Sequence, residues 1–440
     1  MTSGRRPLPA DLPPPGVGRP PRKSSDAPEL ADRIRAEIDA VPGRRITFAR
    51  FMDRALNEPD LGYYRVATDR PTGAGDFLTA PETHAIFGWT VARRIEAMWA
   101  ELGRPEPFHL IEYGAGSGTL ALSILDGMRR HGAVELLAAV RYRPLESNPH
   151  RMLDIERRFE EAGLGGLLNL AGASPSAGSG DGVEVVPVSG VLLANEFLDA
   201  LPVHRVVVRG GELREIFVAR RDEAGGATGG SGGATGGSTD AAGAVGGVAG
   251  ATDGATSGAA GGFVQVTARP STPDLAARLD DDGIALAEGQ VAEVCLGLEP
   301  WLRDVAGRLA RGYVLAIDYG YDAAELYGSR RLAGTLLGYR GHRVEEDPLA
   351  DPGEIDLTAH VDFTALDRLA ATAGFRTVSR TNQSDFLVAG GLEEELRALQ
   401  SSPDLDLADY ARARSAILRL LDPRHMGRFQ VLTLERNPAG

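Results

Sequence analysis

Three closely spaced glycines follow an acidic residue in the segment HLIEYGAGSGTLALSIL, residues 109–125. The glycines are Gly114, Gly116 and Gly118, and the acid is Glu112, two residues before the first of them. Glycine lets the backbone turn sharply and lets a ligand approach closely, and a helix that starts here would offer unpaired N–H groups. A carboxylate at Glu112 would repel a pyrophosphate but would suit a cation. The segment therefore predicts a site for S-adenosyl-L-methionine (SAM), which combines adenosine with a sulfonium and an ammonium group.

A dinucleotide cofactor is the main alternative for this glycine cluster. The dinucleotide fingerprint is G-x-G-x-x-G/A, whereas this chain has Thr119 at the sixth position, so its pattern is G-x-G-x-G. That shorter form is the one seen in class I methyltransferases. A nicotinamide-dependent reductase is accordingly a further hypothesis, and Thr119 and Glu112 both count against it.

A second group of polar residues lies in ANEFLDALPVHR, residues 194–205. Asn195, Glu196 and Asp199 supply one amide and two carboxylates within five residues. In methyl transfer an enzyme mainly positions and desolvates the nucleophile. Two carboxylates can bind a guanidinium in a forked geometry and draw its charge away from the attacking nitrogen. We predict that these three residues are catalytic and hold the acceptor; the alternative is that one of the acids only orients the loop through backbone hydrogen bonds.

Three more residues are candidates for contact with the cofactor. Glu146 ends an apolar segment, where an acid can accept hydrogen bonds from ribose hydroxyls; the alternative is an exposed acid at a strand end. Thr79 and Pro81 lie in GDFLTAPETHAIFG, residues 75–88, which is typical of a loop leading into a helix. This loop is expected either to close over the cofactor or simply to begin a capped helix.

Two later motifs carry charged or metal-binding residue types. The motif DLTAHVDF contains Asp356, His360 and Asp362. For these residues a role at a helix start and in the wall of the active site is favoured over the binding of a metal ion. The segment GYRGHR, residues 338–343, is expected either to grip an acidic feature of a partner or to form a solvated loop. We predict no metal ligand.

Strands and helices alternate along the chain. The expected strands are 108–113, 140–146, 190–195, 313–318, 375–380 and 429–435; the expected helices are 83–102, 119–130, 149–161, 290–310 and 362–373; a hairpin is expected over 204–218. This order predicts an α/β, Rossmann-like fold with a mostly parallel sheet and helices on both faces. The candidate residues fall at the carboxyl ends of strands, where such folds bind ligands.

Composition narrows the class of protein further. The chain has 440 residues, 43% of them hydrophobic, and a formal net charge of -14, which disfavours nucleic acid as a partner. Its single cysteine, Cys295, excludes an intramolecular disulfide, and we expect it to be a buried thiol in the helix 290–310. The sequence predicts no membrane span and no secretory signal, so the cytoplasm is the expected location.

The domain organisation follows from two segments of low complexity. Residues 1–27 are rich in proline and are expected to be disordered, and a Gly/Ala-rich stretch at about 222–262 is expected to be a flexible insertion. Residues 28–440 would then form one methyltransferase domain that contains this insertion. Nothing in the sequence indicates the oligomeric state.

Eight motifs along the chain resemble those of the MidA-like class I SAM-dependent methyltransferases, in the same order. They are GYY, GDFLTAPE, EYGAGSGTL, NEFLDALPVHR, IDYGY, GTLLGYRGH, DLTAHVDF and MGRFQVL, between about residues 46 and 432. The family includes a mitochondrial assembly factor of respiratory complex I that is a protein arginine methyltransferase. The resemblance implies a class I core with helical N-terminal and inserted elements, SAM bound by the three glycines and Glu146, and an acceptor bordered by Asn195, Glu196 and Asp199.

The resemblance also implies a protein substrate with an arginine acceptor, such as a respiratory-complex subunit. Eukaryotic relatives are mitochondrial, and a substrate need not be shared between relatives. The alternative from a different class is a non-catalytic assembly factor or chaperone-like protein that binds SAM without turnover.

Overall fold

A six-stranded sheet forms the centre of the molecule, in the order β15-β16-β9-β4-β2-β3. The computed structural model describes residues 27–66, 79–170, 186–221, 262–341, 343–402 and 406–437. The parallel strands are β2 (Phe108–Tyr113), β3 (Val140–Leu145), β4 (Val188–Asn195) and β9 (Leu309–Asp318); β16 (Gln430–Arg436) runs antiparallel to both β9 and β15 (Arg376–Asn382). The expected α/β fold with a mostly parallel sheet is confirmed.

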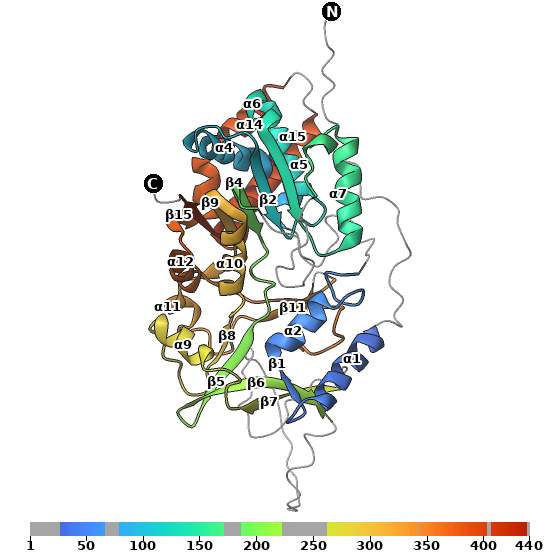
Figure 1. Cartoon of the computed structure of the whole chain (residues 1–440), viewed down its shortest axis with the longest axis vertical. Coiled ribbons are helices and arrows are strands. Elements are labelled where there is room, and N and C mark those ends of the chain that lie inside the picture. The colour runs from blue at the N-terminus through green and yellow to red at the C-terminus, as the bar shows by residue number, and fades with distance from the viewer. Residues whose placement is uncertain are drawn as a thin grey trace, which may run out of the picture.

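Helices cover both faces of this sheet (Figure 1). One face packs against α4 (Ile86–Glu101), α5 (Thr119–Arg130), α6 (Val134–Ala139), α7 (Pro149–Glu161), α13 (Gln383–Ala389), α14 (Leu392–Gln400) and α15 (Leu407–Leu421). The other packs against α10 (Leu298–Arg308) and α12 (Phe363–Thr372). All six residues of β2 are buried, as expected for a central strand covered on both faces.

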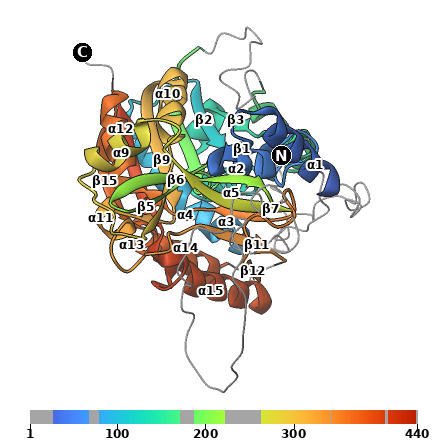
Figure 2. The same ribbon diagram turned by 90° about the horizontal axis from the view of Figure 1, so that it is seen from below.

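A second, antiparallel sheet consists of strands from the chain between β4 and β9 and of β1 from the N-terminal part. Its order is β1-β6-β5-β8, and β7 also pairs with β6. The bounds are β1 (Arg45–Thr47), β5 (His204–Arg209), β6 (Glu212–Arg220), β7 (Phe263–Ala268) and β8 (Val291–Val294). The predicted hairpin is confirmed: Arg209 pairs with Glu212 around two glycines with positive φ, Gly210 and Gly211. Figure 2 looks onto this sheet from below.

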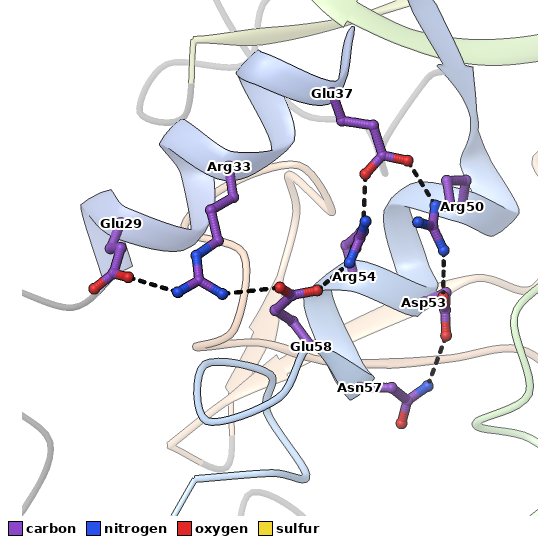
Figure 3. A network of polar contacts seen from close by, with 8 residues as sticks. All are labelled: Glu29, Arg33, Glu37, Arg50, Asp53, Arg54, Asn57 and Glu58. Atoms are coloured by element: carbon purple, nitrogen blue, oxygen red, sulfur yellow. Dashed lines mark hydrogen bonds and ion pairs between the residues drawn. The ribbon is translucent and has the colours of Figure 1, made fainter. Parts of the chain in front are cut away.

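The N-terminal helices α1 (Ala27–Ala40) and α2 (Phe48–Asn57) lie beside the antiparallel sheet and share a core with β1, β6 and β7. A network of ion pairs joins the two helices (Figure 3). Glu37 on α1 accepts from Arg50 and Arg54 on α2 at 2.7 and 2.8 Å, and Glu58 after α2 accepts from Arg33 on α1 at 3.0 Å. The network fixes the end of α2, from which the chain continues toward the central sheet.

The segment between β9 and α12 forms small elements at the edge of the molecule. They are β10 (Gly320–Tyr321), α11 (Ala323–Leu326), β11 (Leu337–Arg340), β12 (Arg343–Glu345), β13 (Asp356–Thr358) and β14 (Val361–Asp362). Strand β11 pairs antiparallel with both β12 and β13, and β10 pairs parallel with β14. This segment carries the DLTAHVDF motif to the carboxyl end of the central sheet.

Two of the predicted helices differ in the structure. The helix expected over 290–310 is wrong in its first part, where β8 pairs with β5 and α10 begins only at Leu298, so Cys295 lies between a strand and a helix. The β-branched Val291 and Val294 favour a strand once a neighbouring strand supplies hydrogen bonds. The helix expected over 83–102 is split into α3 (Ala80–Thr83) and α4, because His84 has an extended backbone.

The two segments of low complexity fall almost wholly outside the described residues. Of the predicted tail only Ala27 is described, and it begins α1; of the predicted insertion only Gly262 is described. Among the described helices, none is both long and apolar enough to cross a membrane.

Candidate active site

The predicted residues gather where the strand order of the central sheet reverses. Strands β2 and β4 are neighbours, but the chain passes from β2 to β3 on one side before it returns to β4 on the other. Ligands of open α/β sheets bind at such a switch point, beyond the carboxyl ends of the strands. The glycine loop follows β2, and Asn195 ends β4. The structure therefore brings the two main predicted groups side by side.

The three glycines all have positive φ, between 56° and 74°. A Cβ on Gly114 would lie 2.9 Å from Phe197 Cδ2, and a Cβ on Gly118 would lie 3.2 Å from Ile155 Cγ1, so both are packed against side chains. A Cβ on Gly116 would meet only the Gly114 carbonyl oxygen, at 3.9 Å. The loop is thus a tight turn that stays open at Gly116, which fits the close approach of a cofactor.

Glu146 lies directly beside this turn. Its Oε2 accepts from the Gly116 backbone N–H at 2.9 Å, and its Oε1 accepts from the Asn148 backbone N–H at 2.8 Å. The side chain is buried. A carboxylate has about four lone-pair positions, so two backbone bonds leave capacity for ribose hydroxyls. The ribose role of Glu146 fits this geometry and stays a prediction.

Glu112 is buried within β2, on the same side of the sheet as Tyr142. Its Oε2 accepts from the Tyr142 hydroxyl at 2.6 Å. Burial raises the pKa of Glu112 to about 8, and the charge of Glu146 adds to this shift, which outweighs the hydrogen bond from Tyr142. Without a cation nearby the carboxyl is mostly protonated at neutral pH; a cation at this position would favour its ionised form.

The acceptor residues share one property: each carries a buried polar atom that has no hydrogen-bond partner among the described residues. These atoms are Asn195 Oδ1, Glu196 Oε2 and Asp199 Oδ1. All three are acceptors, and buried polar groups are normally paired. These three atoms therefore receive no hydrogen bond from the described residues, and a bound molecule with several N–H groups would donate to them.

The two predicted catalytic carboxyls have raised pKa values. Burial raises the pKa of Glu196 to about 8, helped by the charge of Asp199. Burial raises the pKa of Asp199 to about 6, against the opposing hydrogen bond from the Tyr319 hydroxyl to Asp199 Oδ2. Each group can therefore change its protonation state between pH 6 and 8.

The backbone of the acceptor loop is held by a different acid, Asp318 at the end of β9. Its Oδ2 accepts from the backbone N–H groups of Phe197, Leu198 and Asp199 at 2.9 to 3.3 Å. Burial, with the charges of Asp199 and Glu196, raises the pKa of Asp318. Asp318 thus orients the loop through backbone hydrogen bonds, while Glu196 also accepts one backbone bond, from the Ala80 N–H; the alternative that Glu196 or Asp199 only orients the loop stays open.

The Thr79–Pro81 segment lies against the acceptor loop. Thr79 precedes α3 without a side-chain cap bond, Pro81 is buried in its first turn, and the Ala80 N–H donates to Glu196 Oε1 at 2.9 Å. A helix does start here, but the expected side-chain cap is absent within the described part of the chain. Contact of Thr79 and Pro81 with the cofactor stays a prediction.

The DLTAHVDF motif borders the site from another side. Asp362 caps α12 by accepting from the Ala365 N–H at 3.0 Å, so the predicted helix start is confirmed. His360 packs against Tyr319 with ring centroids 5.3 Å apart, and burial lowers its pKa to about 4. Within the described ranges no three His, Cys, Asp or Glu residues are grouped as metal ligands. Arg340 pairs with Asp351 at 2.9 Å, and His342 lies outside the described residues.

An α/β sheet with an open glycine turn at its switch point and buried carboxyl groups beside it is the arrangement of enzymes that use an adenosine-bearing cofactor. The chain belongs to a family of S-adenosyl-L-methionine-dependent methyltransferases, whose sequence profile matches residues 90–381. It is an enzyme of that family, and SAM is its cofactor. The open turn at Gly116 and the carboxylate of Glu146 fit that cofactor.

Several known proteins are similar over nearly the whole chain. The mitochondrial protein arginine methyltransferase NDUFAF7 of Mus musculus is 27% identical, covering 88% of this chain and 80% of that protein. The NDUFAF7 homolog of Drosophila melanogaster is 29% identical, covering 92% and 84%. A protein from Burkholderia thailandensis, solved with S-adenosyl-homocysteine bound, is 28% identical, with a TM-score of 0.73 and 96% of each chain covered.

Sequence reasoning missed three residues that the structure places at the site: Asn148, Tyr319 and Tyr64. Asn148 follows Glu146 by two positions and precedes a proline, which is a signal for a helix cap. Tyr64 lies in the GYY family motif, and Tyr319 lies in IDYGY at the end of the expected strand 313–318, where ligands bind, but no role was predicted for either side chain. Their side-chain partners, Asp199 and Asp356, are 120 and 292 residues away, so no local pattern could have indicated them.

Proposed function

We propose that this methyltransferase modifies an arginine side chain of a protein, with Asn195, Glu196 and Asp199 as the residues that hold the acceptor. The single observation that carries the proposal is the set of three buried acceptor atoms that have no donor among the described residues. A guanidinium has five N–H donors in a planar fork and no acceptor, so it complements this set. An ammonium would present three donors from one point and would match the spread of oxygens less well.

The pocket residues would both bind the guanidinium and take up a proton. SAM, when bound, supplies a methyl group on a sulfonium sulfur. As the new N–C bond forms and the C–S bond breaks, the attacking nitrogen loses one proton, and the product keeps a single positive charge. Ionised Glu196 or Asp199 accepts that proton, and a pKa near the working pH suits a general base.

The relatives support the same acceptor. The NDUFAF7 proteins of mouse, fly and zebrafish are all named as protein arginine methyltransferases. We further propose that Gly114, Gly116, Gly118, Glu112 and Glu146 bind the cofactor, with Thr79 and Pro81 at its edge. We also propose the cytoplasm as the location of this protein, although those relatives are named mitochondrial.

The test is methyl transfer from isotope-labelled SAM to proteins in a lysate that lacks the gene, followed by hydrolysis and separation of the labelled amino acids. We expect label in methylarginine. Glu196→Gln and Asp199→Asn should each lower the rate at least about a hundredfold, the usual range for loss of a general base, while S-adenosyl-homocysteine binding is kept. Glu299→Gln, an exposed glutamate on α10, is the matched control and should leave the rate unchanged.

Label in another amino acid would disprove the arginine assignment. If both site variants fully replace the wild type in a gene-deleted strain, the non-catalytic assembly factor becomes the better account.

A further inference from the structure

A short strap, Gly62–Val66, connects the cofactor side of the site with its acceptor side. It follows α2 and folds back on it: the N–H groups of Tyr63 and Tyr64 donate to the carbonyls of Ala55 and Leu56 at 2.9 and 3.0 Å. The fold-back needs Gly62, since a Cβ there would lie 2.6 Å from the Glu58 nitrogen and the Leu56 oxygen. The ion pairs of Glu58 (Figure 3) hold the base of the strap against α1.

On the cofactor side, the strap is held by the side-chain amide of Asn148. Its Nδ2 donates to the carbonyl oxygens of Tyr64 and Val66 at 2.9 and 3.1 Å, and its Oδ1 accepts from the backbone N–H groups at the start of α7. Carbonyls only accept and N–H groups only donate, so these partners determine the orientation of the amide. Asn148 is 1% exposed, and its own N–H donates to Glu146.

On the acceptor side, the strap is held by its tyrosine. The Tyr64 hydroxyl donates to Asp356 Oδ1 at 2.5 Å. Burial raises the pKa of Tyr64, and the charges of Asp356 and Asp199 add to the shift. The Ala359 N–H, three residues after Asp356, donates to the Asp199 backbone carbonyl oxygen at 3.0 Å, so the segment that carries Asp356 lies against the acceptor loop. One continuous chain of contacts thus runs from Glu146 through Asn148 and the strap to Asp356 beside the acceptor pocket.

We propose that Asn148 and Tyr64 are positioning residues that couple cofactor binding to the acceptor pocket, with the strap as the connecting element. A cofactor that engages Glu146 fixes the turn from Glu146 to Asn148, and the Asn148 amide then fixes the strap. The strap in turn places the Tyr64 ring as a wall of the acceptor pocket. This inference rests on the proposed acceptor site, but its first test does not depend on methyl transfer.

The test compares amide hydrogen exchange of the full chain with and without S-adenosyl-homocysteine. Asn148→Ser is the informative variant, because serine caps a helix about as well as asparagine but cannot donate to both strap carbonyls. Asn382→Ser is the matched control, since Asn382 caps α13 away from the site. In the wild type the ligand should slow exchange in both the glycine loop and the strap.

In Asn148→Ser, exchange over residues 62–66 should be about tenfold faster, from the loss of two hydrogen bonds, and should no longer respond to the ligand. The glycine loop should still respond, and Asn382→Ser should behave as the wild type. Equal protection of the strap in Asn148→Ser and wild type, or an equal response to the ligand, would overturn the inference.

A second readout tests the acceptor side. Tyr64→Phe keeps the ring but loses the bond to Asp356, so it should raise KM for the acceptor protein several-fold while KM for SAM stays constant. A simple loss of fold would lower the amount of active enzyme and therefore the apparent kcat, without changing either KM. If the wild type transfers no methyl group, the proposed function fails, and the exchange experiment still decides whether the strap responds to the cofactor.

Discussion

The backbone N–H of Ala80 donates to Glu196 Oε1 at 2.9 Å, across 116 residues of chain. This bond occupies one oxygen of the carboxyl and leaves Oε2 without a partner among the described residues. Glu196 also has a positive φ of 48°, which is uncommon for a residue with a side chain. The start of α3 therefore holds the Glu196 side chain in position, and the second carboxyl oxygen can accept a hydrogen bond from a substrate.

The pH dependence of activity should follow the two acceptor carboxyls. The pKa values of Asp199 and Glu196 are about 6 and about 8, and a guanidinium binds their ionised forms. We expect kcat/KM for the acceptor to rise from pH 6 to 8 and to level off above, since this ratio reports the free enzyme. Glu196→Gln should remove the upper inflection. A flat profile in the wild type would contradict the assignment.

The open face at Gly116 predicts a loss of cofactor binding on substitution. Gly116→Val adds a side chain where the structure has open space and requires a positive φ of 56°, so affinity for S-adenosyl-homocysteine should fall at least about tenfold. Calorimetry measures the change. Gly132→Val is the control, because Gly132 also has positive φ and open surroundings but lies outside the loop. If both variants lose the same affinity for S-adenosyl-homocysteine, backbone strain and not a blocked cofactor site explains the loss.

Glu146 should be needed in its ionised form. In Glu146→Gln only one side-chain oxygen remains, so one of the backbone N–H groups of Gly116 and Asn148 loses its partner. A hydrogen bond to a charged group contributes roughly 1.5–3 kcal/mol, so S-adenosyl-homocysteine affinity should fall about tenfold to a hundredfold. The exposed Glu135→Gln, which loses only a surface ion pair with Arg104, should bind normally. Normal binding by Glu146→Gln would remove Glu146 from the cofactor site.

Stability without cofactor should fall as the pH rises, in part because of Glu112. Its pKa is about 8 in the folded protein against 4.5 for the free side chain. Folding thus favours the protonated carboxyl. The contribution of this carboxyl to the free energy of unfolding is fully present below about pH 4.5 and is lost as the pH rises through 8. Glu112→Gln should flatten the dependence of Tm on pH between 5 and 8.5. If the two profiles run parallel, burial does not raise this pKa.

Local sequence patterns were sufficient for the central elements of the core. Strand β2 and helices α5 and α7 have the bounds that the periodicity and the glycine and proline signals predicted. These elements are determined by neighbouring residues: a mostly apolar segment for the strand, glycines before α5, and a proline in the first turn of α7. The expected location of the polar residues, at the carboxyl ends of parallel strands, followed from the alternation of strands and helices.

Tertiary structure alone decided the elements and roles that depend on distant partners. Strand β8 was predicted as helix because its pairing with β5 crosses more than 80 residues of chain, which apolar spacing does not reveal. The different roles of the three acids Asp318, Glu196 and Asp199 also depend on residues that are distant in the chain. Asp318 accepts backbone hydrogen bonds from the loop, whereas Glu196 and Asp199 each have one oxygen without a partner among the described residues. Only the positions of the backbone N–H groups around each carboxyl distinguish the three acids. Residue types and their spacing in the sequence indicated which side chains meet at the switch point. The folded chain decides which of their polar atoms are hydrogen-bonded and which have no partner among the described residues.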